Sequence, residues 1–279
     1  MYRGVSEIGI EREHIQFYFG KLVEDPGITY YPVVLALRSS PLLIIGILGL
    51  LIFWKKIFVK GDRKFLLYSL FFVFFYLVML TIPTKKLDRY ILPDILVLSV
   101  LTTIFWVFII DKIRLLPIVK YLALVLLSAA PLFALHPDYL SYYNPIFGGL
   151  KTGIRVLEPK WMIGGREITA YFDDAARKEN LNRVYGATSL EEVTSGSAYS
   201  SYLTVGFQEK YYTQIFPFFR LIGGYAVVED LTPFAQKTKY FVYPVWDDIS
   251  KDETRFKLEF QDVIKERGVD IYKVYKRVE

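Results

Sequence analysis

The chain has 279 residues, a formal net charge of +5 and no cysteine. The lack of cysteine excludes disulfides and thiolate-bound metals, and two histidines are too few for a zinc site without much carboxylate help. The positive charge does not indicate nucleic-acid binding, because the cations gather at the ends of apolar runs, where membrane topology explains them. These runs end near Leu135, and the remaining residues have the composition of a water-soluble domain. We therefore expect a membrane half and a water-facing half.

Four apolar segments are long enough to cross a membrane. At about 1.5 Å per residue, each spans roughly 26–37 Å, against a hydrocarbon core of about 30 Å. Residues 1–29 are polar, lack the apolar core of a signal peptide and are expected to form an outer loop segment. The predicted transmembrane helices, within residues 30–135, cover residues 30–54, 65–82, 92–110 and 115–135.

The charges between these segments predict the orientation of the chain. Connections rich in Lys and Arg stay in the cytoplasm. The first and third connections are basic, with Lys55, Lys56, Lys60, Arg63 and Lys64 in one and Lys112 and Arg114 in the other. The second connection and residues 136–279 then lie outside the cell membrane. An exported N-terminal stretch without a signal is simplest to explain if further spans precede Met1, so we expect a fragment or half of a larger protein.

Residues 136–279 are predicted to form a small extracytoplasmic α/β domain, because short β-branched and aromatic runs alternate with helical patterns. A Pro- and Gly-rich loop over residues 136–165 opens it. The predicted elements then follow as helix Arg166–Lys178, strands at 182–187, 202–207, 225–228 and 240–243, helix Asp252–Arg267 ending at Gly268, and strand Val269–Val278. No catalytic motif stands out in this half, and the acidic pairs Asp173-Asp174 and Asp247-Asp248 are expected on solvated surfaces.

The most informative stretch is Lys85-Lys86-Leu-Asp-Arg89-Tyr90-Ile-Leu-Pro93. It places three cations between two apolar runs, on the side where topology does not call for positive charge. Charges near hydrocarbon are costly and usually functional. A lipid phosphate is the natural partner at that depth, and diffuse contact with anionic headgroups is the alternative.

Two more charged residues lie near the ends of predicted spans. Arg38 has two interpretations: it snorkels to the outer interface, or it points inward to the same phosphate, with Pro41 bending the helix. Asp94 follows Pro93 in the first turn of the third helix, where a carboxylate suits the positive end of the helix dipole. We expect Asp94 to cap that helix.

Three blocks of sequence together resemble one family. Residues 85–93 are similar to the Lys-Leu-x-Arg-Tyr-x-Leu-Pro signature of the dolichyl-phosphate-mannose protein mannosyltransferases and the bacterial aminoarabinose transferases. These are C-type (GT-C) membrane glycosyltransferases that use polyprenyl-phosphate sugars. His136-Pro137-x-Tyr139 through Asn144-Pro145-x-x-Gly148-Gly149 resembles the stretch after the last span of many prokaryotic members. Residues 17–41 resemble their last long outer loop and the span after it.

The resemblance implies a division of roles among the residues of this chain. Lys86, Arg89, Lys85 and Arg38 would bind the phosphate of the lipid donor, and His136, Tyr143 and Asn144 would line the acceptor entrance. Cations at the phosphate would stabilise the negative charge that grows on it as the glycosidic bond breaks. Members of the family are much longer, and their catalytic acid lies in the first outer loop. This chain thus resembles the C-terminal half, with no catalytic residue of its own and no evident metal or cofactor.

The expected function is transfer of a sugar from a polyprenyl-phosphate donor to an acceptor on the outer face of the membrane. The expected partners are the lipid-linked sugar, membrane lipids, and a missing N-terminal half or partner chain that supplies the general base. The alternative is a non-catalytic membrane subunit whose outer α/β domain binds a partner or a glycan. In that case the basic turn is only a lipid contact.

Overall fold

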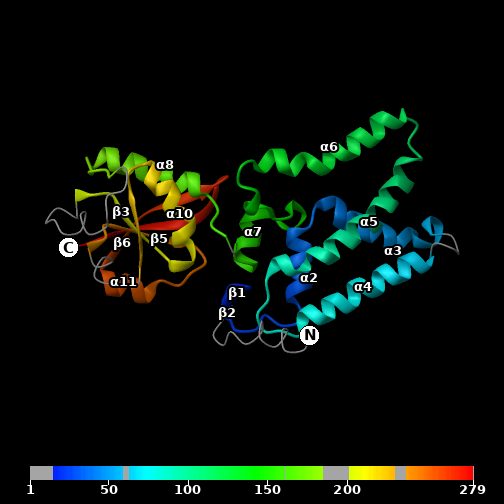
Figure 1. Cartoon of the computed structure of the whole chain (residues 1–279), viewed down its shortest axis with the longest axis horizontal. Coiled ribbons are helices and arrows are strands. Elements are labelled where there is room, and N and C mark those ends of the chain that lie inside the picture. Colours follow the sequence, from blue (N-terminus) through cyan, green and yellow to red (C-terminus); the bar gives the residue numbers. More distant parts are fainter. Residues whose placement is uncertain (1–14, 59–62, 160, 185–200, 230–236, 279) are drawn as a thin grey trace. The chain divides into compact units, whose positions relative to one another are not determined.

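A computed structural model describes residues 15–58, 63–159, 161–184, 201–229 and 237–278 (Figure 1). The chain divides into two compact units, Met1–Glu158 and Pro159–Glu279, and each is described by itself. Residues 136–158, expected to open the soluble domain, belong to the helical unit. Lys60, residues 1–14 and the second half of the predicted strand 182–187 lie outside the described residues.

The N-terminal unit is helical apart from one short hairpin (Figure 1). Three of its helical segments, Arg63–Thr81, Asp88–Ile110 and Pro117–Leu135, are long and apolar enough to cross a membrane, and a fourth span is possible if α2 and α3 count as one. In chain order the elements are β1 Gln16–Tyr18, β2 Lys21–Val23, α2 Tyr30–Arg38, α3 Pro41–Ile57, α4 Arg63–Thr81, η1 Asp88–Ile91, α5 Leu92–Ile110, α6 Pro117–Leu135, η2 Tyr139–Ser141, η3 Pro145–Phe147 and α7 Gly149–Val156.

The first predicted span is not one helix. The prediction of a single helix over residues 30–54 was wrong, because α2 and α3 meet at a bend of 116°. Ser40 has an extended backbone and its hydroxyl accepts a hydrogen bond from the Leu43 amide at 3.2 Å, which caps the start of α3. Pro41 follows at the first helical position, and proline disfavours helical geometry in the residue before it. The Ser40-Pro41 pair therefore ends one helix and begins the next.

The outward surfaces of the long helices are apolar. In α4 the buried residues are Val73 and Leu80, and in α6 no residue is buried within the unit. Large exposed side chains such as Phe71 and Phe133 are costly in water and favourable in hydrocarbon. These surfaces indicate a membrane protein, in agreement with the predicted helical half.

Helices α3 and α5 approach each other closely through small residues. A Cβ on Gly49 would lie 2.2 Å from the Phe105 ring, and one on Gly46 would lie 2.6 Å from the Thr102 side chain. Small residues at such crossings are typical of helix packing in membranes. The Trp106 Nε1 group adds a hydrogen bond of 3.0 Å to the Leu42 carbonyl.

The C-terminal unit is an α/β domain, as expected. Its described strands form one sheet in the order β4-β3-β5-β7-β6, parallel from β4 to β5 and antiparallel beyond. Helices α8 and α10 cover one face, where Phe172 packs on Phe219 and Tyr240, and α11 covers the other, where Phe256 stacks on Phe241. The bounds are α8 Gly165–Lys178, β3 Thr204–Phe207, α10 Glu209–Leu221, β4 Tyr225–Val228, β5 Tyr240–Pro244, α11 Ser250–Phe256, β6 Leu258–Glu266 and β7 Val269–Arg277.

The helix predicted over residues 252–267 was confirmed for residues 252–256 only. Helix α11 ends at Phe256, Lys257 takes a positive φ of 52°, and strand β6 follows. Arg267 and Gly268 both have positive φ and join Glu266 to its partner Val269, which makes a two-residue hairpin turn. Gly268 therefore closes a hairpin instead of ending a helix. The prediction of a loop over 136–165 was also too simple, because α7 forms within it.

We expect Gly49→Val to destabilise the helical unit. The added side chain has no room against Phe105, and overpacking of this kind costs about 1–3 kcal/mol. The measurement is the thermal unfolding midpoint of the purified protein in detergent. Ile52→Val is the control, because Ile52 is on the same helix and 72% exposed. Equal midpoints for the two variants would contradict the close packing of α3 on α5.

Candidate functional site

The basic turn, defined as residues 85–89, connects α4 to α5 and carries three of the four predicted phosphate ligands. The fourth, Arg38, is the last residue of α2. Its Nε lies 3.3 Å from Oδ2 of Asp88, inside the basic turn. The fold therefore brings Arg38 to the turn across fifty residues of sequence, as the inward interpretation of Arg38 requires.

Lys86 is fully buried, and its ammonium is bound by protein groups. Its Nζ lies 2.5 Å from Oδ1 of Asp25 and donates to the Pro83 carbonyl at 2.8 Å. The Lys86 side chain is 0% exposed, whereas that of Asp25 is 45% exposed. The carboxylate of Asp25 thus lies between the buried ammonium and solvent.

The charge state of Asp25 follows from these contacts. Burial opposes ionisation, but the Lys86 ammonium and the Gly27 amide, which donates at 2.8 Å, together lower the pKa of Asp25 below its ordinary value. A carboxyl group with a lowered pKa stays ionised at neutral pH and loses its pairing energy only as the pH falls through that pKa. The Asp25 carboxylate that faces Lys86 is therefore ionised at neutral pH.

Short segments from the N-terminal hairpin hold this arrangement in place. Gln16 is buried, and its amide accepts from the Lys86 amide at 3.3 Å and donates to the Thr84 carbonyl at 3.2 Å. The Tyr18 hydroxyl donates to Thr29 at 2.9 Å, which fastens the far end of the loop that carries Asp25. Both the backbone of the basic turn and the loop that faces it are thus fixed to β1.

Arg38 forms the centre of a second group of contacts. Its guanidinium donates to the carbonyls of Tyr142 at 2.7 Å and Leu140 at 3.3 Å, and to the Tyr143 hydroxyl at 3.2 Å. It also lies 4.0 Å from the centre of the Tyr143 ring, and its side chain is 17% exposed. Such contacts hold Arg38 within the protein and do not direct it to the interface.

Tyr143 and Asn144, predicted at the acceptor entrance, belong to the Arg38 group. Burial raises the pKa of Tyr143, the charge of Arg38 opposes the rise, and the Tyr143 hydroxyl also donates to the Leu157 carbonyl at 2.6 Å. The backbone N–H of Asn144 donates to the Leu37 carbonyl at 2.7 Å. The structure therefore places two predicted acceptor residues beside a predicted donor residue.

The other predicted site residues lie apart from these contacts. Arg89 is exposed, with its guanidinium 5.9 Å from the Tyr90 ring, and Lys85 is half-buried. His136 is exposed and makes a local contact of 2.7 Å to the Tyr139 hydroxyl. Its predicted role at the acceptor entrance stays a prediction.

Several residues of the site were not predicted. Asp25 forms an ion pair with Lys86, and Asp88 forms one with Arg38. Gln16 holds the backbone of the basic turn. Asp25-Pro26-Gly27 is visible in the sequence as a turn, but Lys86, the ion-pair partner of Asp25, is 61 residues away.

Asp94 lies in the first turn of α5, as expected, but it does not cap the helix with its side chain. Asp94 is fully buried, and among the described residues neither of its carboxylate oxygens has a hydrogen-bond partner.

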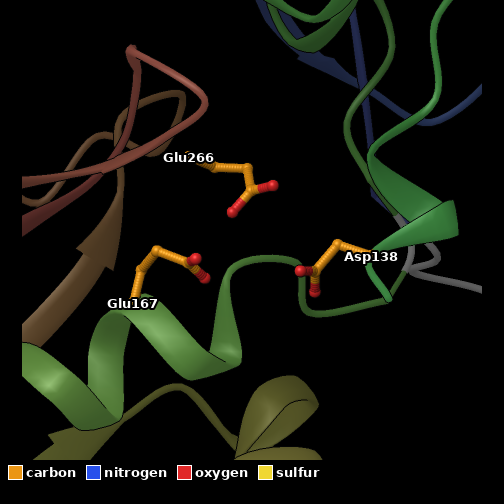
Figure 2. A group of neighbouring side chains, drawn as sticks. All are labelled: Asp138, Glu167 and Glu266. Atoms are coloured by element: carbon orange, nitrogen blue, oxygen red, sulfur yellow. The ribbon is translucent and has the colours of Figure 1, made fainter. Parts of the chain in front are cut away.

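The C-terminal unit holds an acidic pair of its own. Glu167 in the first turn of α8 and Glu266 at the end of β6 have carboxylates within 4.8 Å of each other (Figure 2). Each also contacts an arginine next to it in sequence, Arg166 at 3.2 Å and Arg267 at 3.0 Å. Asp138, which Figure 2 also labels, belongs to the N-terminal unit. Paired acidic groups at a helix start are common without a ligand, and we assign no site here.

No protein-family model, no curated protein and no solved structure matches this chain.

The burial of Lys86 has a measurable consequence. In acylation by a small amine-reactive reagent, mapped by mass spectrometry, we expect Lys86 to react far more slowly than the exposed Lys64. Asp25→Ala should raise the Lys86 rate about tenfold or more, because a charge-assisted contact of about 1.5 kcal/mol or more is lost. Glu24→Ala, a change at the neighbouring exposed carboxylate, should leave the rate unchanged. A fast reaction of Lys86 in the unaltered protein would contradict its burial.

Proposed function

We propose that this chain is the C-terminal half of a membrane glycosyltransferase that transfers a sugar from a polyprenyl-phosphate donor to an acceptor on the outer face of the cell membrane. The observation that carries the proposal is the gathering of Arg38 and the basic turn at one end of a set of apolar helices. Arg38 reaches the turn through its 3.3 Å contact with Asp88. The resemblance of residues 85–93 to the family signature supplies the reaction class.

The charges of the site suit a phosphate attached to a lipid. Four cations, Arg38, Lys85, Lys86 and Arg89, gather at this end of the unit. Among the described residues, Asp88 contacts Arg38 and Asp25 contacts Lys86. Cations gathered in this way favour a polyanionic group, and the adjacent helices offer apolar surface to its hydrocarbon chain. Arginine adds a planar set of donors that matches phosphate oxygens.

The proposed reaction needs stabilisation of the leaving phosphate and a general base for the acceptor, and this chain supplies the first. When the glycosidic bond breaks, negative charge grows on the leaving phosphate, and fixed cations stabilise it in the transition state. The acceptor hydroxyl must lose a proton to a general base. In the family that role belongs to a carboxylate in the first outer loop, so we assign it to the N-terminal half or to a partner chain.

The proposed orientation follows from the basic ends of the other connections. Lys55 and Lys56 end α3, Arg63 and Lys64 begin α4, and Lys112 follows α5. Positive connections of this kind stay in the cytoplasm. The basic turn and the α/β unit then lie on the extracytoplasmic side, where the lipid-linked sugar would be used.

Binding of a phosphate at Lys86 would require an exchange of partners. Asp25 now occupies the side of Lys86 that is nearest to solvent, at 2.5 Å. A phosphate oxygen would take the place of the Asp25 carboxylate, so that Lys86 is never left buried without an anion. Such an exchange avoids the large cost of an unpaired buried charge. The exposed loop that holds Asp25 is the part that would move.

The first test removes cations from the basic turn. Lys86→Ala with Arg89→Ala should weaken binding of a polyprenyl phosphate by about tenfold or more per residue, because each charge-assisted contact contributes about 1.5–3 kcal/mol. A polyprenol without the phosphate should compete poorly. Because Lys86 is buried, Arg89→Ala alone is measured as well, since substitution of an exposed side chain changes stability little.

The matched control for this test is Lys55→Ala with Lys64→Ala, which removes the same charge from the opposite connection. We expect it to retain binding. If it weakens binding as much as the changes in the turn do, the cations act only through diffuse membrane electrostatics. The chain is then better explained as a non-catalytic subunit.

The second test concerns Asp25. Asp25→Asn keeps the shape of the side chain and removes its charge, so the competitor for Lys86 becomes weaker and polyprenyl phosphate should bind about fivefold more tightly. Glu24→Gln makes the same change of charge one residue away and should have little effect. Weaker binding by Asp25→Asn would show that Asp25 is not displaced by the phosphate.

A further inference from the structure

A groove of about 430 Å³ runs between α3, α4 and α5. Most of its lining residues are aliphatic, with Leu51 from α3, Leu67 from α4 and Leu98 from α5 among them. The lining follows residues 47–54 of α3 and 63–70 of α4, about 10 Å of each helix. Leu51 and Leu67 are more than half exposed, so the groove opens to the outside of the unit.

Arg63 is the charged member of this lining. It is the first residue of α4, it is exposed, and its Nε donates to the Phe58 carbonyl at 3.3 Å. Its guanidinium lies 5.5 Å from the ring of Trp54, which also lines the groove. These two contacts hold the guanidinium at the end of an apolar channel, and the aromatic ring beside it is typical of the membrane interface.

The sequence around Arg63 is also rich in cations, with one carboxylate, Asp62, before it. Lys55 and Lys56 form the last turn of α3, and Lys64 is the next residue of α4. Juxtamembrane cations attract anionic lipids, and basic pockets between membrane helices bind anionic headgroups. The groove thus combines a slot for hydrocarbon with a cation at its end.

We propose that this groove binds one anionic phospholipid, with an acyl chain between α3, α4 and α5 and the phosphate on Arg63. The size of the groove favours an acyl chain over a helix of a partner. A helix of about 10 Å diameter and 5.4 Å pitch fills roughly 400 Å³ per turn, so the groove would hold a single turn. The site lies at the end of the helices opposite to the basic turn and does not depend on the proposed transferase activity.

The test compares two lipids with the same acyl chains. Native mass spectrometry of the purified full chain in detergent is used to measure binding of phosphatidylglycerol and phosphatidylcholine. We expect the anionic lipid to bind about tenfold more tightly. Arg63→Gln should remove most of this preference, while Lys64→Gln, with the same loss of charge beside the groove, should keep most of it.

A second pair of variants tests the position of the acyl chain. Leu67→Trp fills the mouth of the groove and should weaken retention of phosphatidylglycerol although Arg63 is intact. Leu126→Trp, at an exposed position of α6 that does not line the groove, should have no effect. Equal binding of the two lipids would overturn the proposal. So would equal losses for Arg63→Gln and Lys64→Gln, which would indicate diffuse attraction only, or full retention by Leu67→Trp.

Discussion

The ion pair between Lys86 and Asp25 is the constraint around which the helical unit is arranged. An ammonium group that is fully buried beside apolar helices is too costly to leave without an anion. Asp25 supplies that anion from the loop before α2, and Gln16 fixes the backbone of the same turn from β1. The N-terminal hairpin, the loop 24–29 and the start of α5 are therefore connected through one charged contact and its hydrogen bonds.

The bend between α2 and α3 determines the position of Arg38, the second cation that is held inside the helical unit. If residues 30–54 formed one straight helix, Arg38 would lie about 12 Å from its start, on the wall of an apolar helix. The break at Ser40 and Pro41 instead makes Arg38 the end of a short helix, where its guanidinium meets the carbonyls of Leu140 and Tyr142 and the carboxylate of Asp88. A cation at a helix C-terminus is also favoured by the helix dipole.

The two ends of the helical unit differ in how their cations are used. At the basic turn, Lys86 and Arg38 are held inside by carboxylates and carbonyl groups, so a ligand there must compete with the protein. At the other end, Arg63 is exposed beside an open apolar groove. The first arrangement favours a ligand with more charge than a carboxylate, and the second favours an amphiphile that brings its own hydrocarbon.

The sequence by itself determined where α4, α5 and α6 lie and which segments form α8, β3, β4, β5 and β7, because hydrophobic periodicity and turn residues are local signals. It also located the basic turn. It did not predict the break between α2 and α3, or helix α10. Tertiary structure decided the rest. Residues 258–266 form a strand because they pair with β7 across the Arg267-Gly268 turn. Asp25 and Lys86 form an ion pair although 61 residues separate them in the sequence. Such pairings depend on distances between segments remote in the chain, which no local pattern contains.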